Sequence, residues 1–135
     1  MLKLSKKTEY AFMAARYLAL NNSGHCSTAK EIAENYDISR ELVAKVLQNF
    51  ARSDIAASFQ GVKGGYVLKK NPEEVSLFDI ILSVEDKHHL TNCLSEDNPD
   101  EKCSHEDGCK IRDPLIEIQK RIDNLFLETS LKQIL

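Results

Sequence analysis

Residues 28–70 read TAKEIAENYDISRELVAKVLQNFARSDIAASFQGVKGGYVLKK, and their side-chain pattern changes from helical to strand-like along the stretch. Thr28, with Glu31 three residues later, forms the capping-box pattern that starts a helix, and this helix should end near residues 36–37. Ser39 is a natural N-cap for a second helix directly after the break. The sequence therefore predicts two short helices joined by a tight turn, a helix-turn-helix.

The second predicted helix has two chemically different faces. Apolar residues recur along one face, which we expect to be buried against the first helix: Leu42, Val43, Val46, Leu47 and Phe50. The other face carries groups able to reach phosphates and base edges: Arg40, Glu41, Lys45, Gln48, Asn49 and Arg52. A helix with these two faces can lie in the major groove of DNA.

From residue 55 the chain changes to strand character. Ile55, Ala57 and Phe59 alternate with smaller or polar residues, and residues 66–68 are strand formers. Between them, GVKGG at 61–65 has the glycines that a tight or positive-φ turn needs. The predicted fold is mainly α with a small β-wing (α+β), a winged helix-turn-helix; the plainer alternative is a small α+β core with a solvated turn.

The charge distribution is consistent with DNA binding. The net charge is −3, but residues 1–70 hold 11 Lys+Arg against 6 Asp+Glu (+5), and residues 71–135 hold 7 against 15 (−8). A basic front half suits a polyanion because phosphate affinity depends on local charge, although two differently solvated halves would look the same. We expect contacts with a double-stranded DNA operator from the helices and the wing: Thr28, Ser39, Arg40, Lys45, Lys63, Gly64 and Gly65.

Length and composition predict one soluble domain with a real core, because the chain has 135 residues of which 42% are hydrophobic. Its beginning shows no signal peptide, and no apolar run is long enough to cross a bilayer. We therefore expect a cytoplasmic protein without a membrane partner.

Three more helices are predicted outside the helix-turn-helix. One covers residues 5–20, and Ser76 caps a short one that ends at Val84. The last carries a long apolar stripe: Ile111, Leu115, Ile118, Ile122, Leu125 and Phe126. Two copies packed along this stripe would form a homodimer with recognition helices ~34 Å apart, and the alternative is packing on its own domain. The predicted organisation is a DNA-binding domain (1–84), a cysteine-bearing sensor loop (85–109), and a dimerisation helix with the C-terminal segment (110–135).

Three cysteines, Cys93, Cys103 and Cys109, lie close together in the predicted sensor loop. Nine residues separate Cys93 from Cys103, and five separate Cys103 from Cys109, whereas Cys26 lies far away. The absence of CxxC pairs disfavours a zinc ribbon or finger. Soft thiolates on one loop can hold an iron-sulfur cluster with a fourth ligand from elsewhere. Zinc, redox thiols and an inert loop stay open as alternatives.

Several motifs together resemble the Rrf-two family of bacterial transcription regulators. They are KLS at 3–5, YA at 10–11, KEIA at 30–33, ISR at 38–40, GVKGGY at 61–66, LFDI at 77–80, the three cysteines and TSL at 129–131. The resemblance implies a homodimeric winged helix-turn-helix regulator or repressor. It also implies a cluster on the three cysteines beside the dimer helix, communicating with the recognition helix of the partner chain.

The ligand pattern departs from the family in two places. The gap between Cys93 and Cys103 is longer than the gap of about five residues that is common in cluster-binding members. Some members place a histidine three residues after the last cysteine, where this chain has Arg112. Others use a carboxylate of the first helix, and Glu9 occupies the matching place, so we expect Glu9 as the fourth ligand, with His105 as the second choice.

The predicted function is regulation of transcription, with DNA affinity controlled by an iron-sulfur cluster that senses nitric oxide, redox state or cluster supply. The alternative is a cluster-free regulator of the same family that responds to thiol oxidation or a protein partner. An enzyme or electron carrier lacks support, because the sequence has no CxxC redox pair, phosphate loop or nucleophile constellation.

Overall fold

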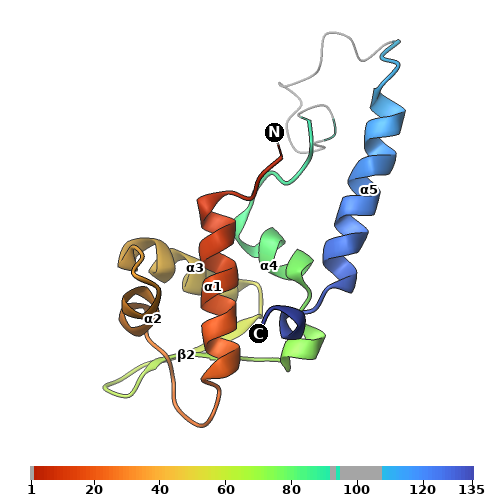
Figure 1. Ribbon diagram of the computed structural model, residues 1–135. Coiled ribbons are helices and arrows are strands. Elements are labelled where there is room, and N and C mark those ends of the chain that lie inside the picture. Colours follow the sequence, from red (N-terminus) through yellow and green to blue (C-terminus); the bar gives the residue numbers. More distant parts are fainter. Residues whose placement is uncertain (1, 92–93, 95–107) are drawn as a thin grey trace.

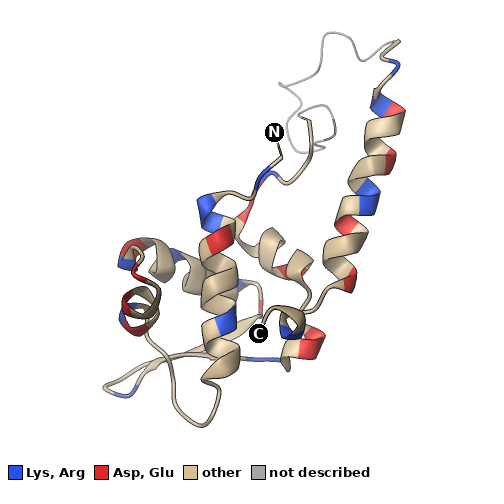
Figure 2. Cartoon of the chain, viewed as in Figure 1, with Lys and Arg blue, Asp and Glu red and all other residues tan. Residues whose placement is uncertain are grey.

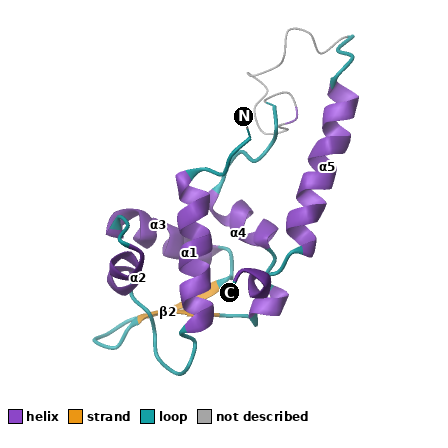
Figure 3. Ribbon diagram, viewed as in Figure 1, coloured by secondary structure: helices purple, strands orange, loops and turns teal. Residues whose placement is uncertain are grey.

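The computed structural model describes residues 2–91, 94 and 108–135, and it is mainly helical with one small hairpin (Figures 1 and 3). The helices are α1 (Lys6–Leu20), α2 (Ala29–Tyr36), α3 (Arg40–Arg52), α4 (Leu77–Val84) and α5 (Arg112–Glu128). Strands β1 (Ala56–Phe59) and β2 (Gly65–Leu68) form the hairpin, and η1 (Pro72–Glu74) and η4 (Leu131–Ile134) are short 3₁₀ helices. This order confirms the predicted winged helix-turn-helix.

Local capping explains why the helices begin where the sequence predicts. At the starts of α1, α2, α3 and α4 a hydroxyl oxygen accepts a hydrogen bond from a backbone N–H three residues later, at Ser5, Thr28, Ser39 and Ser76, whereas α5 follows Ile111 and has no side-chain cap. Thr28 makes this half of its predicted capping box, with Glu31 N at 3.1 Å. Both halves form at Ser76, where the Asp79 carboxylate also accepts from the Ser76 N–H at 3.1 Å.

The core lies where α1 crosses α3 and α4 (Figure 1). Alanines on α1 let the helices approach closely, and larger side chains of the other elements fill the remaining space. The largest fully buried apolar side chains are Leu18, Ile32, Val43, Val46, Leu47, Phe50, Ile80 and Leu131. Because Leu131 belongs to η4, the C-terminal segment packs into the core of the DNA-binding unit.

Two apolar residues are more exposed than the sequence pattern predicts. Leu42 is 38% exposed, because it lies about a quarter-turn from the centre of the buried stripe, in the first turn of α3. Phe59 is 54% exposed at the far end of β1. The hairpin is covered by the core only at its near end, where Ala56 pairs with Leu68. In both cases the exposure of the side chain depends on how far neighbouring elements cover the surface, which the local sequence pattern does not indicate.

The wing is fastened to the loop that precedes α2. Strands β1 and β2 pair antiparallel, from Ala56 with Leu68 to Phe59 with Gly65. On the other side of β2, the Ser27 N–H donates to the Tyr66 carbonyl at 2.9 Å, and the Tyr66 N–H donates to the Ser27 carbonyl at 2.8 Å. This bridge holds the base of the wing beside the start of the helix-turn-helix.

The bridge requires glycine at position 65, which gives a first prediction. Gly65 has φ +146°, and a Cβ there would lie 2.6 Å from the Ser27 carbonyl oxygen, a backbone atom that cannot move aside. We expect Gly65→Ala to lower the free energy of unfolding by about 1–3 kcal/mol. Urea unfolding measures this, with Ser58→Ala on the exposed side of β1 as the control. Equal stability of the two variants would contradict the role assigned to the bridge.

The long helix α5 extends away from the body of the molecule and is anchored at its C-terminal end (Figure 1). The Leu77 N–H donates to the Thr129 carbonyl at 2.9 Å, and the Leu131 N–H donates to the Val75 carbonyl at 2.7 Å. Arg16 of α1 adds a further tie through its Nε, which donates to the Ile134 carbonyl at 3.2 Å. Within the described ranges, no helix has the length and apolar character needed to span a membrane.

Candidate nucleic-acid interface and sensor region

Helix α3 has one buried and one exposed face, as a recognition helix requires. Arg40 and Lys45 are exposed and form no ion pair within the described part of the chain. Their charges are therefore available to a partner outside the chain. Asn49 is half-buried, and its Oδ1 accepts a hydrogen bond from Arg52 at 2.8 Å, so this pair of the predicted donors is already engaged.

The N-cap hydroxyls can serve a second purpose. Thr28 and Ser39 accept backbone N–H groups at the starts of α2 and α3, which leaves each hydroxyl proton free to donate. Helix N-termini also carry a partial positive charge that attracts phosphate. These positions are compatible with the predicted contacts to DNA, with Ser39 exposed and Thr28 half-buried.

The wing carries a basic tip on a glycine-built turn. Lys63 is exposed, and Figure 2 shows this tip projecting from the body of the molecule. The Gly64 N–H donates to the Gly61 carbonyl at 3.0 Å, and a Cβ at Gly64 would lie 2.4 Å from the Phe59 carbonyl oxygen. Gly64 is therefore needed for the turn itself, and Lys63 is the group that reaches outward.

The structure places only part of the predicted cluster site. Cys93, Cys103 and His105 lie outside the described residues. Cys109 is a half-buried free thiol just before α5, and the Glu9 carboxylate on α1 lies 2.8 Å from Lys6 Nζ. Among the described positions, no group of three or more His, Cys, Asp or Glu residues is placed to hold a metal ion. The ligand set thus stays a prediction.

Comparison with known proteins decides the family. The family model described as "Rrf2: Iron-dependent Transcriptional regulator" matches residues 4–135. The chain belongs to the Rrf2 family. Because members of this Rrf-two family are transcriptional regulators, the protein is a DNA-binding regulator and not an enzyme, as predicted.

Individual relatives agree with the family and the fold. This Rrf2 regulator is 27% identical to the HTH-type transcriptional regulator NsrR of Shouchella clausii over 116 residues, covering 86% of this chain and 76% of that one. It resembles the structure of CymR, the global cysteine regulator of B. subtilis, with TM-score 0.76 and 23% identity, covering 99% and 96% of the two chains. It also resembles T. potens IscR, with TM-score 0.73 and 22% identity, covering 98% and 85%. These structural similarities confirm the fold.

An ion pair that the sequence did not indicate joins the end of the recognition helix to the wing of this Rrf2 regulator. Asp54 follows α3 with φ +63°, and its carboxylate pairs with Lys69, the residue after β2. The hydrogen bond and charge of Lys69 hold the pKa of the Asp54 carboxyl below its ordinary value. The pair joins the residue after α3 to the residue after β2, and because both side chains are about half exposed or more, its effect on stability is small.

This pair gives a prediction about pH. We expect Lys69→Met to raise the pKa of Asp54 toward its ordinary value, because the hydrogen bond and the nearest positive charge are lost. A lowered folded-state pKa stabilises the fold above the unfolded-state pKa, and this contribution disappears as the pH falls through the folded-state value. Carboxyl NMR titration measures the change. Lys70→Met is the control, because Lys70 makes the smallest contribution; an unchanged Asp54 pKa in Lys69→Met would contradict the pairing.

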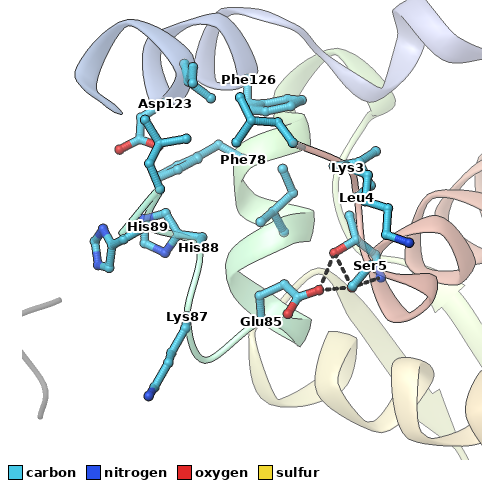
Figure 4. Close-up of a pocket in the computed structure, with 15 residues that line it drawn as sticks. Lys3, Leu4, Ser5, Phe78, Glu85, Lys87, His88, His89, Asp123 and Phe126 are labelled. Carbon is cyan, nitrogen blue, oxygen red and sulfur yellow. Dashed lines mark hydrogen bonds between the residues drawn. The ribbon is translucent and has the colours of Figure 1, made fainter. Parts of the chain in front are cut away.

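The region around α5 contains a buried donor and a cavity. Arg112, three residues after Cys109, has a buried Nε that makes no hydrogen bond within the described residues. A cavity of about 240 Å³ lies between the N-terminal arm, α4, residues 85–90 and α5 (Figure 4). Its lining includes the apolar Phe78 and Phe126 and the acidic Glu85 and Asp123.

Proposed function

We propose that this Rrf2 regulator is a homodimeric repressor whose affinity for operator DNA is controlled by an iron-sulfur cluster on Cys93, Cys103 and Cys109. The observation that carries DNA recognition is the exposed face of α3, where Arg40 and Lys45 form no ion pair with any described residue, together with the exposed Lys63 at the tip of the wing. Control by iron is supported by the family description and by the three thiols between α4 and α5. The functional division into residues 1–84, 85–109 and 110–135 follows from this proposal.

Two described residues, Glu9 and Arg112, have side chains that are chemically suited to support such a cluster. Among the described residues, the Glu9 carboxylate forms an ion pair with Lys6, whose side chain is 77% exposed; such pairs stabilise little, so this carboxylate can be recruited as a fourth ligand. His105 is the second choice for that ligand. The unsatisfied Arg112 Nε can donate a hydrogen bond to a sulfur or thiolate nearby. Bound there, the cluster supplies a group that oxidation, nitric oxide or iron loss can destroy.

Dimerisation is proposed through α5. Ile111, Ile118 and Leu125 recur every seven residues and are 63%, 46% and 62% exposed. A line of exposed apolar side chains at heptad spacing is typical of a helix that packs against another helix. A second copy of α5 would cover this line and hold two recognition helices on one DNA duplex.

A cluster-free regulator is the second candidate. Arg112 stands where some relatives have a histidine ligand, and a guanidinium can donate hydrogen bonds to an oxidised sulfur as well as to the sulfurs of a cluster. Control would then come from thiol oxidation or from a partner protein. The structural similarity to CymR fits this candidate as well as the similarity to IscR fits the first.

Iron and sulfide counting after anaerobic purification separates the two candidates. We expect brown protein that contains iron and acid-labile sulfide, and we expect Cys103→Ala and Cys109→Ala each to abolish the colour because each removes a ligand. Cys26→Ala is the matched control and should stay brown, since Cys26 lies in the loop before α2. Colourless parent protein without iron after reconstitution would reject the cluster and favour the thiol-based alternative.

A further inference from the structure

Residues 85–90, here called the strap, join α4 to the segment that carries the clustered cysteines. Figure 4 shows the strap beginning at Glu85, next to Ser5, and running through Lys87 to His88 and His89; its residues line the cavity described above. It is fixed at its two ends by different elements. These fixings place two polar side chains in a position to connect the cysteine segment with the DNA-reading helices.

The first fixing joins the strap to α1 through Glu85. One Glu85 carboxylate oxygen accepts hydrogen bonds from the Thr8 hydroxyl at 2.6 Å and from the Ser5 hydroxyl. Thr8 is 1% exposed, and Ser5 is the N-cap of α1. The carboxylate therefore lies at the positive end of α1, where the helix dipole also favours it. A shift of Glu85 would disturb the first turn of a helix that packs directly on α3.

The second fixing joins the strap to α5 through Gln119. This side chain is 6% exposed in the middle of α5, and its Oε1 accepts from the Leu90 N–H at 2.6 Å. Its Nε2 donates to Asp123 Oδ1 at 2.8 Å and is 3.5 Å from the His88 carbonyl oxygen. Both ends of the buried amide are thus satisfied by the strap and by α5 itself. Losing Gln119 would leave the end of the strap nearest the cysteines without these bonds.

The cavity makes these two fixings important. A cavity of about 240 Å³ borders the strap, so one side of the strap faces open space and not packed side chains. One contact of the strap with α4 is the His88 ring, which packs edge-on against Phe78 with centroids 5.5 Å apart. The strap therefore has room to move when a fixing is lost, whereas a tightly packed segment would not.

We infer that Glu85 and Gln119 are positioning residues that transmit the state of the cysteine segment, through the strap, to α1 and from there to α3. The inference rests on the proposed function, because the signal that it transmits arises at the cysteines. Breaking either fixing leaves the recognition helix and the wing intact but uncouples them from the cysteine segment.

Methionine variants test this inference because methionine keeps the side-chain length and removes the polar atoms. Gln119→Met and Glu85→Met each break one fixing, and Thr8→Val removes one donor to the same carboxylate if Glu85→Met does not fold. Glu128→Met makes a matched change at an exposed position near the end of α5. All variants are made in the full chain and compared with the parent.

Amide hydrogen exchange measures the coupling between the strap and α1 in protein that has no DNA or cluster bound. In Gln119→Met we expect about tenfold faster exchange at Leu90 and also at the Thr8 and Glu9 amides of α1, which Gln119 does not touch. A merely local role would change Leu90 alone. Faster exchange confined to Leu90, or equally fast exchange at α1 in Glu128→Met, overturns the inference.

DNA affinity provides the functional readout, with a duplex selected by the parent protein from a random pool as the probe. The quantity compared is the ratio of the DNA affinity with iron bound to the affinity without iron. If this ratio differs from one in the parent, we expect it to fall toward one in Gln119→Met and Glu85→Met and to be unchanged in Glu128→Met. A ratio kept by all variants overturns the inference. If the parent itself shows no ratio, the proposed function fails, and hydrogen exchange alone still decides whether the strap couples α5 to α1.

Discussion

Replacing Leu125 by aspartate should convert the protein from a dimer to a monomer and weaken operator binding by about 100-fold or more, because the avidity of two linked recognition helices is lost. Leu125 is 62% exposed in the described chain and contributes little to the core of its own subunit. A carboxylate buried between two α5 helices would lack a partner, which is costly. The subunit itself should keep its helical content.

Sedimentation measures the oligomeric state, circular dichroism the helical content, and fluorescence anisotropy the DNA affinity. Lys120→Asp is the matched control, because it puts the same side chain at an exposed polar position of α5. A Leu125→Asp protein that remains a dimer would place the subunit interface elsewhere on the molecule.

Arg40→Ala should weaken binding to the selected operator by roughly 1–3 kcal/mol and also relax the preference for particular bases. The reason is the position of Arg40 in the first turn of α3, exposed and without an ion pair within the described residues. Lys63→Ala removes a charge at the tip of the wing. It should weaken all sequences similarly and reduce the slope of log K against log salt by about one.

A binding series over several salt concentrations and several duplexes distinguishes the two effects. Arg121→Ala provides the control, since Arg121 lies on α5 and pairs with Glu117 at 3.5 Å, away from α3 and the wing. If Arg40→Ala and Lys63→Ala both bind like the parent, the proposed docking of α3 in the major groove is wrong.

The parts of the fold that depend on local chemistry could be predicted from the sequence. Thr28, Ser39 and Ser76 mark helix starts because a capping hydroxyl acts on an amide three residues away. The exposure of Leu42 and Phe59 could not be predicted, because it depends on where distant elements end their cover. The periodicity of apolar residues predicts which face of a helix or strand is buried, and the tertiary structure decides how much of that face is covered.

Long-range polar contacts left no local signal in the sequence. Glu85 accepts hydrogen bonds from Ser5 and Thr8, which are 80 and 77 residues away in the sequence. In the sequence, Gln119 looks like an ordinary polar residue of an amphipathic helix. Their roles follow from tertiary packing alone. For the candidate site, spacing and resemblance indicated the cysteines, and the ligand set, which includes Cys93, Cys103 and His105, stays a prediction because these residues lie outside the described ranges.

The most direct test of the account is the affinity of one preparation for the selected operator, measured anaerobically before and after the iron is removed with a chelator and then restored. The account predicts that affinity changes by roughly tenfold or more on iron loss and returns on reconstitution, because the cysteine segment controls the DNA-reading helices. Equal affinity in both states, while iron counting shows that the metal has left and returned, would contradict it.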